Sequence, residues 1–290
     1  MRSMSVGEIA QESPILKIEE LSVSRSGKTI IKEIDLKIEK GEFVGIVGPN
    51  GSGKSTLLLA ILGVLKSQTG TIGIYGQHHL SRKLDGRIGW VSQAASNLPR
   101  HVRITVHELV QLGTINSKNM FSFVNDERRE RVKKAIEMVG LEDVIDVDLG
   151  RLSGGQRQRA VIARALASDA EFILLDEPLV GIDRESRNAL LKLLDQLCHE
   201  QGKTILMVSH DLTAMLQTAH RMIFLEETIR FDGAAEKFPN LETLADLRGI
   251  EHVHGDGHVH HHNHSKEEEG WVLASWFWRF SLLYWNSLHR

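Results

Sequence analysis

A glycine-rich segment after a short apolar run constrains the fold of this 290-residue chain more than any other feature. The run at 43–47 predicts a strand buried on both faces, and the periodicity of 54–65 predicts a helix. Glycines at such a junction let successive backbone amides point at one anion, and the positive end of the helix dipole adds attraction. The segment matches G-x-x-x-x-G-K-[ST] in the required context. We therefore predict a phosphate-binding loop made of Gly48, Pro49, Asn50, Gly51, Ser52, Gly53, Lys54, Ser55 and Thr56.

The rest of the chain alternates predicted strands and helices, which indicates an α/β fold whose mostly parallel core sheet is covered on both faces. Strands are predicted at 15–24, 30–38, 71–75, 88–92, 171–175, 204–208, 221–225 and 228–231, with a turn at 26–28. Helices are predicted at 106–112, 127–139, 153–167, 184–199 and 212–218. Residues 94–153 contain no convincing strand, so we interpret them as a helical insertion, and with the next helix as a helical subdomain of about 94–165.

Composition excludes several classes of protein. The formal net charge is only −3, so a strongly basic surface is not implied and no nucleic-acid partner is expected. Cys198 is the only cysteine, which excludes an intramolecular disulfide and a Cys-rich zinc module. Met1–Pro14 lacks the apolar region of a secretory signal, and no stretch before residue 270 approaches the roughly 20 apolar residues of a membrane helix.

Two acidic residues follow the apolar strand predicted at 171–175. Ligands of open α/β sheets bind at the carboxyl ends of the strands, so Asp176 and the Ser55 hydroxyl are expected to hold Mg²⁺. Glu177 is expected to polarise a water that attacks a γ-phosphate, while the Lys54 ammonium attracts the outer phosphates.

Two further side chains follow predicted strands of the same sheet. His210 comes after 204–208 and is expected beside the γ-phosphate. Gln93 comes after 88–92 and is a neutral candidate ligand for Mg²⁺ or water. The predicted catalytic residues are thus Lys54, Glu177 and His210, and the predicted Mg²⁺ ligands are Ser55, Gln93 and Asp176.

The sequence LSGGQRQR at 152–159 resembles the signature motif of ABC-type ATPases. The phosphate loop, Gln93, this motif, the strand acids, an aspartate loop at 181–183 and His210 also follow that family's order, over roughly 14–235. The resemblance implies a P-loop NTPase fold of ABC type with an N-terminal antiparallel β subdomain, and ATP and Mg²⁺ as cofactors. It adds as nucleotide-binding residues Ser153, Gly154, Gly155, Gln156 and Asp183.

The signature motif predicts a second anion site. Ser153 can cap the helix that follows, and the two glycines leave backbone amides uncovered. One phosphate does not need two such sites from one subunit. By the resemblance, the motif binds the γ-phosphate of ATP held by a second copy of the chain, in a head-to-tail dimer.

The resemblance also implies partners and a location. ATP hydrolysis would drive a membrane permease that contacts the insertion at 94–153, with a solute-binding protein involved indirectly. The chain would lie peripherally on the cytoplasmic face of the cell (inner) membrane. A non-transport ABC ATPase that acts on a soluble partner is the alternative.

One position departs from the family pattern. Arg25 stands where the family usually carries an aromatic residue that stacks on adenine. A guanidinium can stack on a purine face, so Arg25 is a candidate nucleotide contact, and a merely solvated charge is the alternative.

Two stretches, 103–113 and 175–183, resemble the ATPase subunits of zinc/manganese importers, with iron-chelate and cobalamin importers as alternatives. A histidine-rich tract adds support, because imidazole suits transition metals. A solubilising linker, an accidental tract, a tag residue and a metal-buffering protein are the alternatives. The candidate ligands are His252, His254, His258, His260, His261, His262 and His264.

The composition changes along the chain predict four segments. These are a disordered N-terminus at 1–13, an ATPase domain at 14–240, a His- and acid-rich linker at 241–269 and an aromatic apolar tail at 270–290. Tryptophan and tyrosine favour membrane interfaces, whereas an extension without selected function is the alternative for the tail.

Overall fold

The computed structural model describes residues 13–93, 103–116, 119, 122, 124–168, 170–240 and 243. All of these belong to the first of two compact units, Met1–Thr243 and Leu244–Arg290. The predictions for the N-terminus, the histidine-rich tract and the aromatic tail lie outside the described residues. No helix among the described residues is long and apolar enough to cross a membrane.

An antiparallel sheet of four strands begins the fold, in the order β2-β1-β4-β5. Its strands are β1 (Leu16–Arg25), β2 (Lys28–Ile38), β4 (Thr69–Ile74) and β5 (Gln77–His78). Ser26 and Gly27 have φ values of 52° and 78°, typical of the tight turn that matches strand twist. The predicted strand start at Ile30 is therefore wrong, because this turn already pairs Lys28 with Arg25.

A second hairpin turn explains another difference from the prediction. Tyr75 and Gly76 have φ values of 50° and 68°, so β4 ends at Ile74 and the chain returns as β5. The two-residue strand β5 was not predicted, since it is too short to show an alternating pattern.

The six-stranded core sheet has the order β10-β9-β3-β8-β7-β6. All neighbouring pairs are parallel except β9 with β10, which confirms the mostly parallel sheet. Every residue of β3, β7 and β8 is buried, as expected for strands covered on both faces. The strands are β3 (Phe43–Val47), β6 (Ile88–Val91), β7 (Phe172–Asp176), β8 (Thr204–Val208), β9 (Arg221–Glu226) and β10 (Thr228–Ala234).

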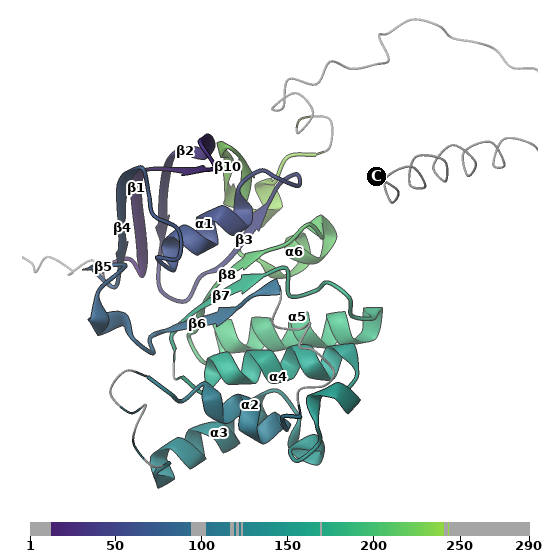
Figure 1. Ribbon diagram of the computed structural model, residues 1–290. Coiled ribbons are helices and arrows are strands. Elements are labelled where there is room, and N and C mark those ends of the chain that lie inside the picture. Colours follow the sequence, from purple (N-terminus) through teal and green to yellow (C-terminus); the bar gives the residue numbers. More distant parts are fainter. Residues whose placement is uncertain are drawn as a thin grey trace, which may run out of the picture. The chain divides into compact units, whose positions relative to one another are not determined.

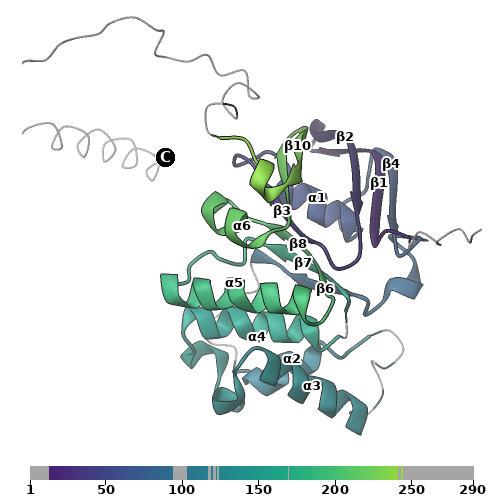
Figure 2. The same cartoon turned by 180° about the vertical axis from the view of Figure 1, so that it is seen from behind.

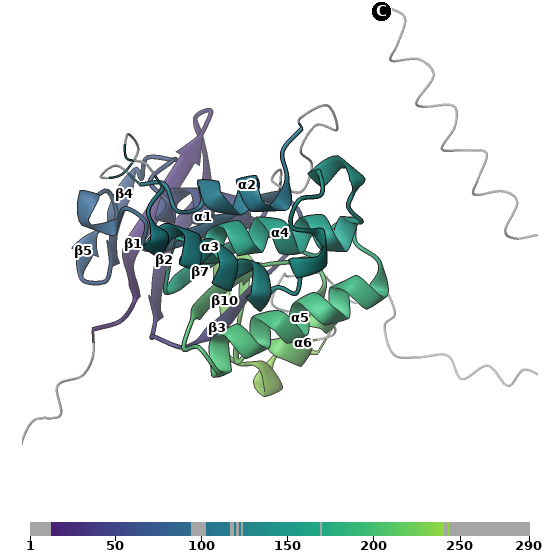
Figure 3. The same ribbon diagram turned by 90° about the horizontal axis from the view of Figure 1, so that it is seen from below.

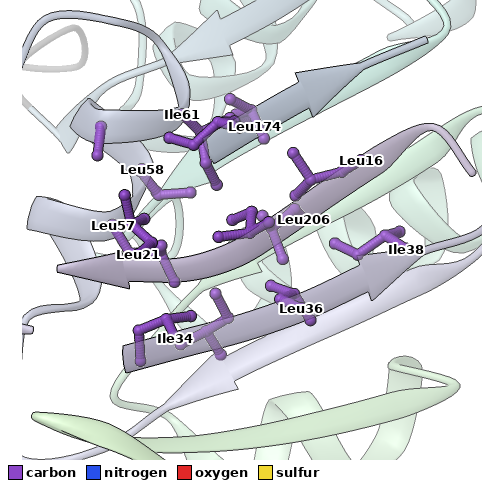
Figure 4. Close-up of a cluster of buried hydrophobic side chains, with 14 of the residues drawn as sticks. Leu16, Leu21, Ile34, Leu36, Ile38, Leu57, Leu58, Ile61, Leu174 and Leu206 are labelled. Carbon is purple, nitrogen blue, oxygen red and sulfur yellow. The ribbon is translucent and has the colours of Figure 1, made fainter. Parts of the chain in front are cut away.

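Helix α1 (Lys54–Ile61) lies between the two sheets, where it contacts β1, β2 and β7 (Figure 1). Its apolar side chains join leucines and isoleucines of both sheets in one core (Figure 4). Each fully buried side chain of this size contributes about 1.5–3 kcal/mol. The predicted helix end at Leu65 is wrong, because Gly63 adopts a left-handed φ of 70° and the Val64 amide turns back to the Leu59 carbonyl.

The opposite face of the core sheet carries α4 (Gly154–Leu166), α5 (Arg184–His199) and α6 (Leu212–Thr218), which contact β6, β8 and β3 respectively (Figure 2). Helices α2 (Val106–Leu112) and α3 (Asp126–Met138) pack against α4 (Figure 3), and they lie farther from the sheet than α4 does (Figure 1). Helices α2 and α3 lie within the range of about 94–165 that is predicted as a helical subdomain, and α4 ends at its boundary. Short 3₁₀ turns occur at Arg82–Leu84, Glu142–Val144, Leu149–Arg151 and Ala235–Lys237.

Candidate nucleotide site

The predicted phosphate loop connects β3 directly to α1. Gly53 is the residue before the helix and has a left-handed φ of 100°. A Cβ atom at this position would lie only 2.3 Å from Cγ2 of Ile31, so the close approach of β2 also requires glycine. A strand of the antiparallel sheet, outside the motif, thus helps to restrict this position of the loop to glycine.

The Lys54 ammonium lies across the start of this loop. Its Nζ donates hydrogen bonds to the carbonyls of Gly48 and Pro49, each at 2.9 Å. Burial lowers the pKa of Lys54, and the nearby Glu177 and Asp176 carboxylates oppose that shift. The arrangement is a fixed cationic donor next to backbone amides, which suits an anion.

Ser55 and Asp176 come from different elements and form a direct contact. The Ser55 hydroxyl donates to Oδ1 of Asp176 at 3.0 Å, which joins α1 to the end of β7. Burial raises the pKa of the Asp176 carboxyl, while the bond from Ser55 lowers it. A hydroxyl and a carboxylate are oxygen ligands of the kind that Mg²⁺ takes beside phosphates, so these residues fit that ion.

Glu177 and His210 are also in contact, which the sequence did not predict. Oε2 of Glu177 accepts a hydrogen bond from the His210 amide at 3.2 Å and lies 2.7 Å from Nδ1 of its ring. Glu177 has a left-handed φ of 51°, which is uncommon for a residue with a side chain. Its amide donates to the Val208 carbonyl and its carbonyl accepts from the Val180 amide, so the surroundings hold this conformation.

Most of these groups line one open cleft with a volume of about 540 Å³. Gly48, Pro49 and Asp176 are not among its lining residues, and Asp176 is connected to it through the hydrogen bond from Ser55. Arg25 and Gln93 line it, as the sequence predicts, and His210 and Glu177 lie on the same cleft. Ile30 and Val180 also line it and were missed, because their sequence pattern indicates only a strand and a loop. The full lining is Arg25, Ile30, Asn50, Gly51, Ser52, Gly53, Lys54, Ser55, Thr56, Gln93, Glu177, Val180 and His210.

The signature motif lies elsewhere on the chain, at the start of α4, and none of its residues is among those that line the cleft. Ser153 caps α4 as expected. Its hydroxyl accepts from the Gln156 amide at 3.1 Å, and the Gln156 side chain accepts from the Ser153 amide at 3.0 Å. This exchange uses both side chains and leaves the amides of Gly154 and Gly155 at the helix start.

The start of α4 packs against the start of α5. A Cβ on Gly155 would lie 2.2 Å from the Ser186 hydroxyl oxygen, so glycine is required for this contact. Asp183 caps α5 by accepting from the Ser186 amide at 2.9 Å, and this bond lowers the pKa of the Asp183 carboxyl. The signature and the aspartate loop are therefore adjacent in the fold. Neither contributes to the nucleotide cleft of its own chain.

Comparison with known protein families matches residues 31–180 to the family described as ABC transporter. That match covers half of the chain. The chain belongs to the ABC transporter family. Its fold is that of an ABC ATPase, as the sequence resemblance implies, and it is an ATP-binding domain of the type that couples ATP hydrolysis to transport.

Individual relatives of this ABC ATPase are similar over most of their length. The zinc uptake system ATP-binding protein ZurA of Listeria innocua is 38% identical over 81% of this chain and 93% of its own. The iron(3+)-hydroxamate import ATP-binding protein FhuC of Bacillus subtilis is 37% identical over 76% of this chain and 82% of its own. A dimeric, post-hydrolysis structure of the ATP-binding cassette MJ0796 with ADP and Pi has a TM-score of 0.66 and 32% identity, covering 77% of this chain and all of that chain.

Proposed function

We propose that this ABC ATPase powers the import of a transition metal ion, zinc or manganese, through a membrane permease. The observation that carries the ATPase part is one cleft that is lined by residues 50–56 of the phosphate loop and by the Glu177–His210 pair, with Asp176 hydrogen-bonded to Ser55. The net reaction is ATP + H₂O to ADP and phosphate. Arg25, which lines this cleft, would contact the base.

Each residue of the cleft has a role that its position supports. The Lys54 ammonium and the loop amides stabilise negative charge on the outer phosphates. Ser55, Asp176 and Gln93 would hold Mg²⁺, which supplies charge neutralisation between the phosphates when bound. The Glu177 carboxylate orients the attacking water and accepts its proton, and His210 holds that carboxylate in place and contacts the γ-phosphate.

The separate location of the signature motif supports a dimer. Ser153, Gly154, Gly155 and Gln156 present the start of α4 outside the cleft of their own chain. We infer that they close over the nucleotide of a second copy, head to tail, with Asp183 at the same contact. The helical subdomain then contacts the permease at the cytoplasmic face of the inner membrane, and a solute-binding protein delivers the substrate.

Substrate assignment rests on sequence likeness. The zinc relative is slightly more similar than the iron(3+)-hydroxamate relative and covers more of both chains, which favours a metal ion over a chelate. The histidine tract at 252–264 supports the same class, because imidazole binds transition metals.

The ATPase assignment is tested with Glu177→Gln. The amide keeps the shape of the side chain but cannot accept a proton, so we expect turnover to fall by about 10²–10⁴-fold. ATP binding should persist, and an ATP-loaded dimer should accumulate in size-exclusion chromatography. Glu200→Gln, at an exposed position after α5, is the control. Undiminished turnover in Glu177→Gln contradicts the role.

The substrate assignment is tested by transport. The chain is co-expressed with the permease with which it purifies, and ATP-dependent uptake of Zn²⁺, Mn²⁺ and a ferric hydroxamate is measured in vesicles. Uptake of either free ion supports the proposal. Uptake of the chelate alone, or failure to purify with any membrane protein, refutes it. Deletion of 251–269 should weaken uptake at limiting metal.

A further inference from the structure

A cluster of metal-ligating side chains lies outside the nucleotide cleft. Asp195 and His199 are on the last turns of α5, and His220 immediately precedes β9. Each offers one ligand atom, and these atoms all lie within 4.8 Å of one another. Among the described residues this is the one group of three such side chains. We propose that Asp195, His199 and His220 bind a divalent transition-metal ion of the Zn²⁺ class, at a site separate from the proposed ATPase function.

The spacing of the two rings fits a shared ion. Nε2 of His199 lies 3.2 Å from Nε2 of His220, and the ring planes are nearly perpendicular, at 84°. Two nitrogens that each lie about 2.0–2.1 Å from one tetrahedral zinc ion are separated by about 3.3 Å. The two nitrogens therefore already lie at about the separation that one shared ion requires.

Backbone contacts fix which nitrogen of each ring is free. Nδ1 of His199 lies 3.1 Å from the Asp195 carbonyl, which can only accept, so this nitrogen carries a proton and Nε2 has a lone pair. Nδ1 of His220 accepts from the Phe43 amide at 3.2 Å, so in the metal-free chain its proton is on Nε2. That proton points to Nε2 of His199 and holds the two ring nitrogens together.

Metal binding replaces this shared proton. The proton leaves Nε2 of His220, the ring takes one up at Nδ1, and both histidines stay neutral. The Phe43 amide then loses its acceptor, which gives binding a signature at the first residue of β3. The His199 ring keeps its Nδ1 hydrogen bond, the outer contact that typically orients a ligating histidine.

The third ligand and the surroundings complete the site. Oδ1 of Asp195 lies 3.0 Å from Nδ1 of His199, and the Asp195 carboxylate is the third ligand that we assign to the ion. An open cleft of about 530 Å³ is lined by all three residues and by the exposed Glu236, which leaves room for water or a further carboxylate. None of these residues lines the nucleotide cleft.

The test uses the full chain, with the seven histidines of the tract at 252–264 replaced by asparagine to remove a competing site. Binding of Co²⁺ is followed by visible absorption and binding of Zn²⁺ by calorimetry. We expect one ion per chain, and at least about a tenfold weaker affinity in His199→Ala and in His220→Ala, since each loses a ligand. His78→Ala, an exposed histidine elsewhere, is the matched control and should bind like the parent.

Two further measurements separate a metal site from a structural histidine pair. Zn²⁺ should raise the melting temperature of the parent and of His78→Ala but not of the two variants. It should also shift the Phe43 amide signal in an NMR spectrum of the parent. ATP affinity should be the same in all proteins, which shows that each is folded and that the nucleotide site is independent. Equal Zn²⁺ affinity in parent and variants, or no binding by the parent, overturns the proposal.

Discussion

At the scale of single residues, the Asp176 carboxylate is held in surroundings that oppose its charge. Burial raises its pKa, and the charge of Glu177 adds to that effect, while the hydrogen bond from Ser55 and the charge of Lys54 work against it. An ionised group at this position therefore has a cost in stability, whereas the proposed function requires the same group as an oxygen ligand. Stability and function therefore make opposite demands on one side chain.

Asp176→Asn should change stability and ATP turnover in opposite directions. The amide keeps an oxygen that can accept from Ser55 but carries no charge, so the free energy of unfolding of the protein without nucleotide and Mg²⁺ should rise at pH 7. ATP turnover should fall by at least about 100-fold, because a ligand of the ion is lost. Urea unfolding and an ATPase assay measure the two effects. Asp143→Asn, at an exposed position, is the control.

The stability difference between Asp176→Asn and the parent should change with pH in a defined direction. With a raised pKa, folded Asp176 holds a proton that the unfolded chain has released, between the unfolded value of about 3.9 and the higher folded value. Stability contributed by this group falls as the pH rises through that window. The stability gap between Asp176→Asn and the parent should be small at the acid end and largest above the window. A gap that grows on acidification contradicts this account.

At the scale of elements, the contact between α4 and α5 depends on one missing side chain. Gly155 leaves space for Ser186, whose Cβ would lie 2.4 Å from a Cβ on residue 155. The contact aligns the start of the signature helix with the aspartate loop before α5. The glycine of the motif thus serves packing within the chain as well as exposure of backbone amides.

Gly155→Ala should destabilise the fold by about 1–3 kcal/mol through overpacking, despite the better helix propensity of alanine. Ser186→Gly removes the side-chain atoms that the new Cβ would meet. The loss of stability caused by Gly155→Ala should therefore be smaller by about 1 kcal/mol or more in the Gly155→Ala/Ser186→Gly double variant. Ser186→Ala removes the hydroxyl oxygen but keeps the Cβ, so it should give a smaller relief than Ser186→Gly. Urea unfolding of the full cycle measures the coupling, and strictly additive effects would show that this contact is not the cause.

At the scale of the whole molecule, one chain carries both the phosphate loop and the signature motif, but the two motifs do not line a common cleft. The phosphate loop lines the cleft, whereas the signature residues do not. In the proposed head-to-tail dimer, each complete site combines the loop of one copy with the signature of the other. This arrangement predicts a result that requires two different chains in one dimer.

Lys54→Ala and Ser153→Arg should each abolish turnover as pure proteins, because every site in those dimers is damaged. In a mixed dimer, one site carries both changes and the other carries neither. Mixing the two inactive proteins should therefore restore measurable ATP hydrolysis. The phosphate assay is run on each protein and on the mixture, with a Lys54→Ala/Ser153→Arg double variant as the control that cannot complement. Failure of the mixture to recover activity contradicts the shared site.

Local signals in the sequence located most of the fold and most of the cleft. The phosphate loop, the strand-end acids and His210 were found because each follows an apolar run at a recognisable position. Element ends were less predictable. Residues 62–65 continue the apolar pattern of α1, yet the left-handed Gly63 ends the helix earlier. Ile30 and Val180 carry no pattern that would have assigned them to a nucleotide cleft.

The sequence alone determined the α/β class, the phosphate loop and the likeness to the ABC family, because these depend on periodicity and on residues close together in the chain. Only the tertiary structure placed Glu177 against His210, Gly155 against Ser186, and His199 against His220. Those residues are separated by 33, 31 and 21 positions, and no local propensity relates them. Parallel strands require crossover connections, so the ends of two neighbouring strands, or the starts of two helices on one face, come from distant parts of the chain. These contacts therefore depend on the tertiary structure and not on local sequence.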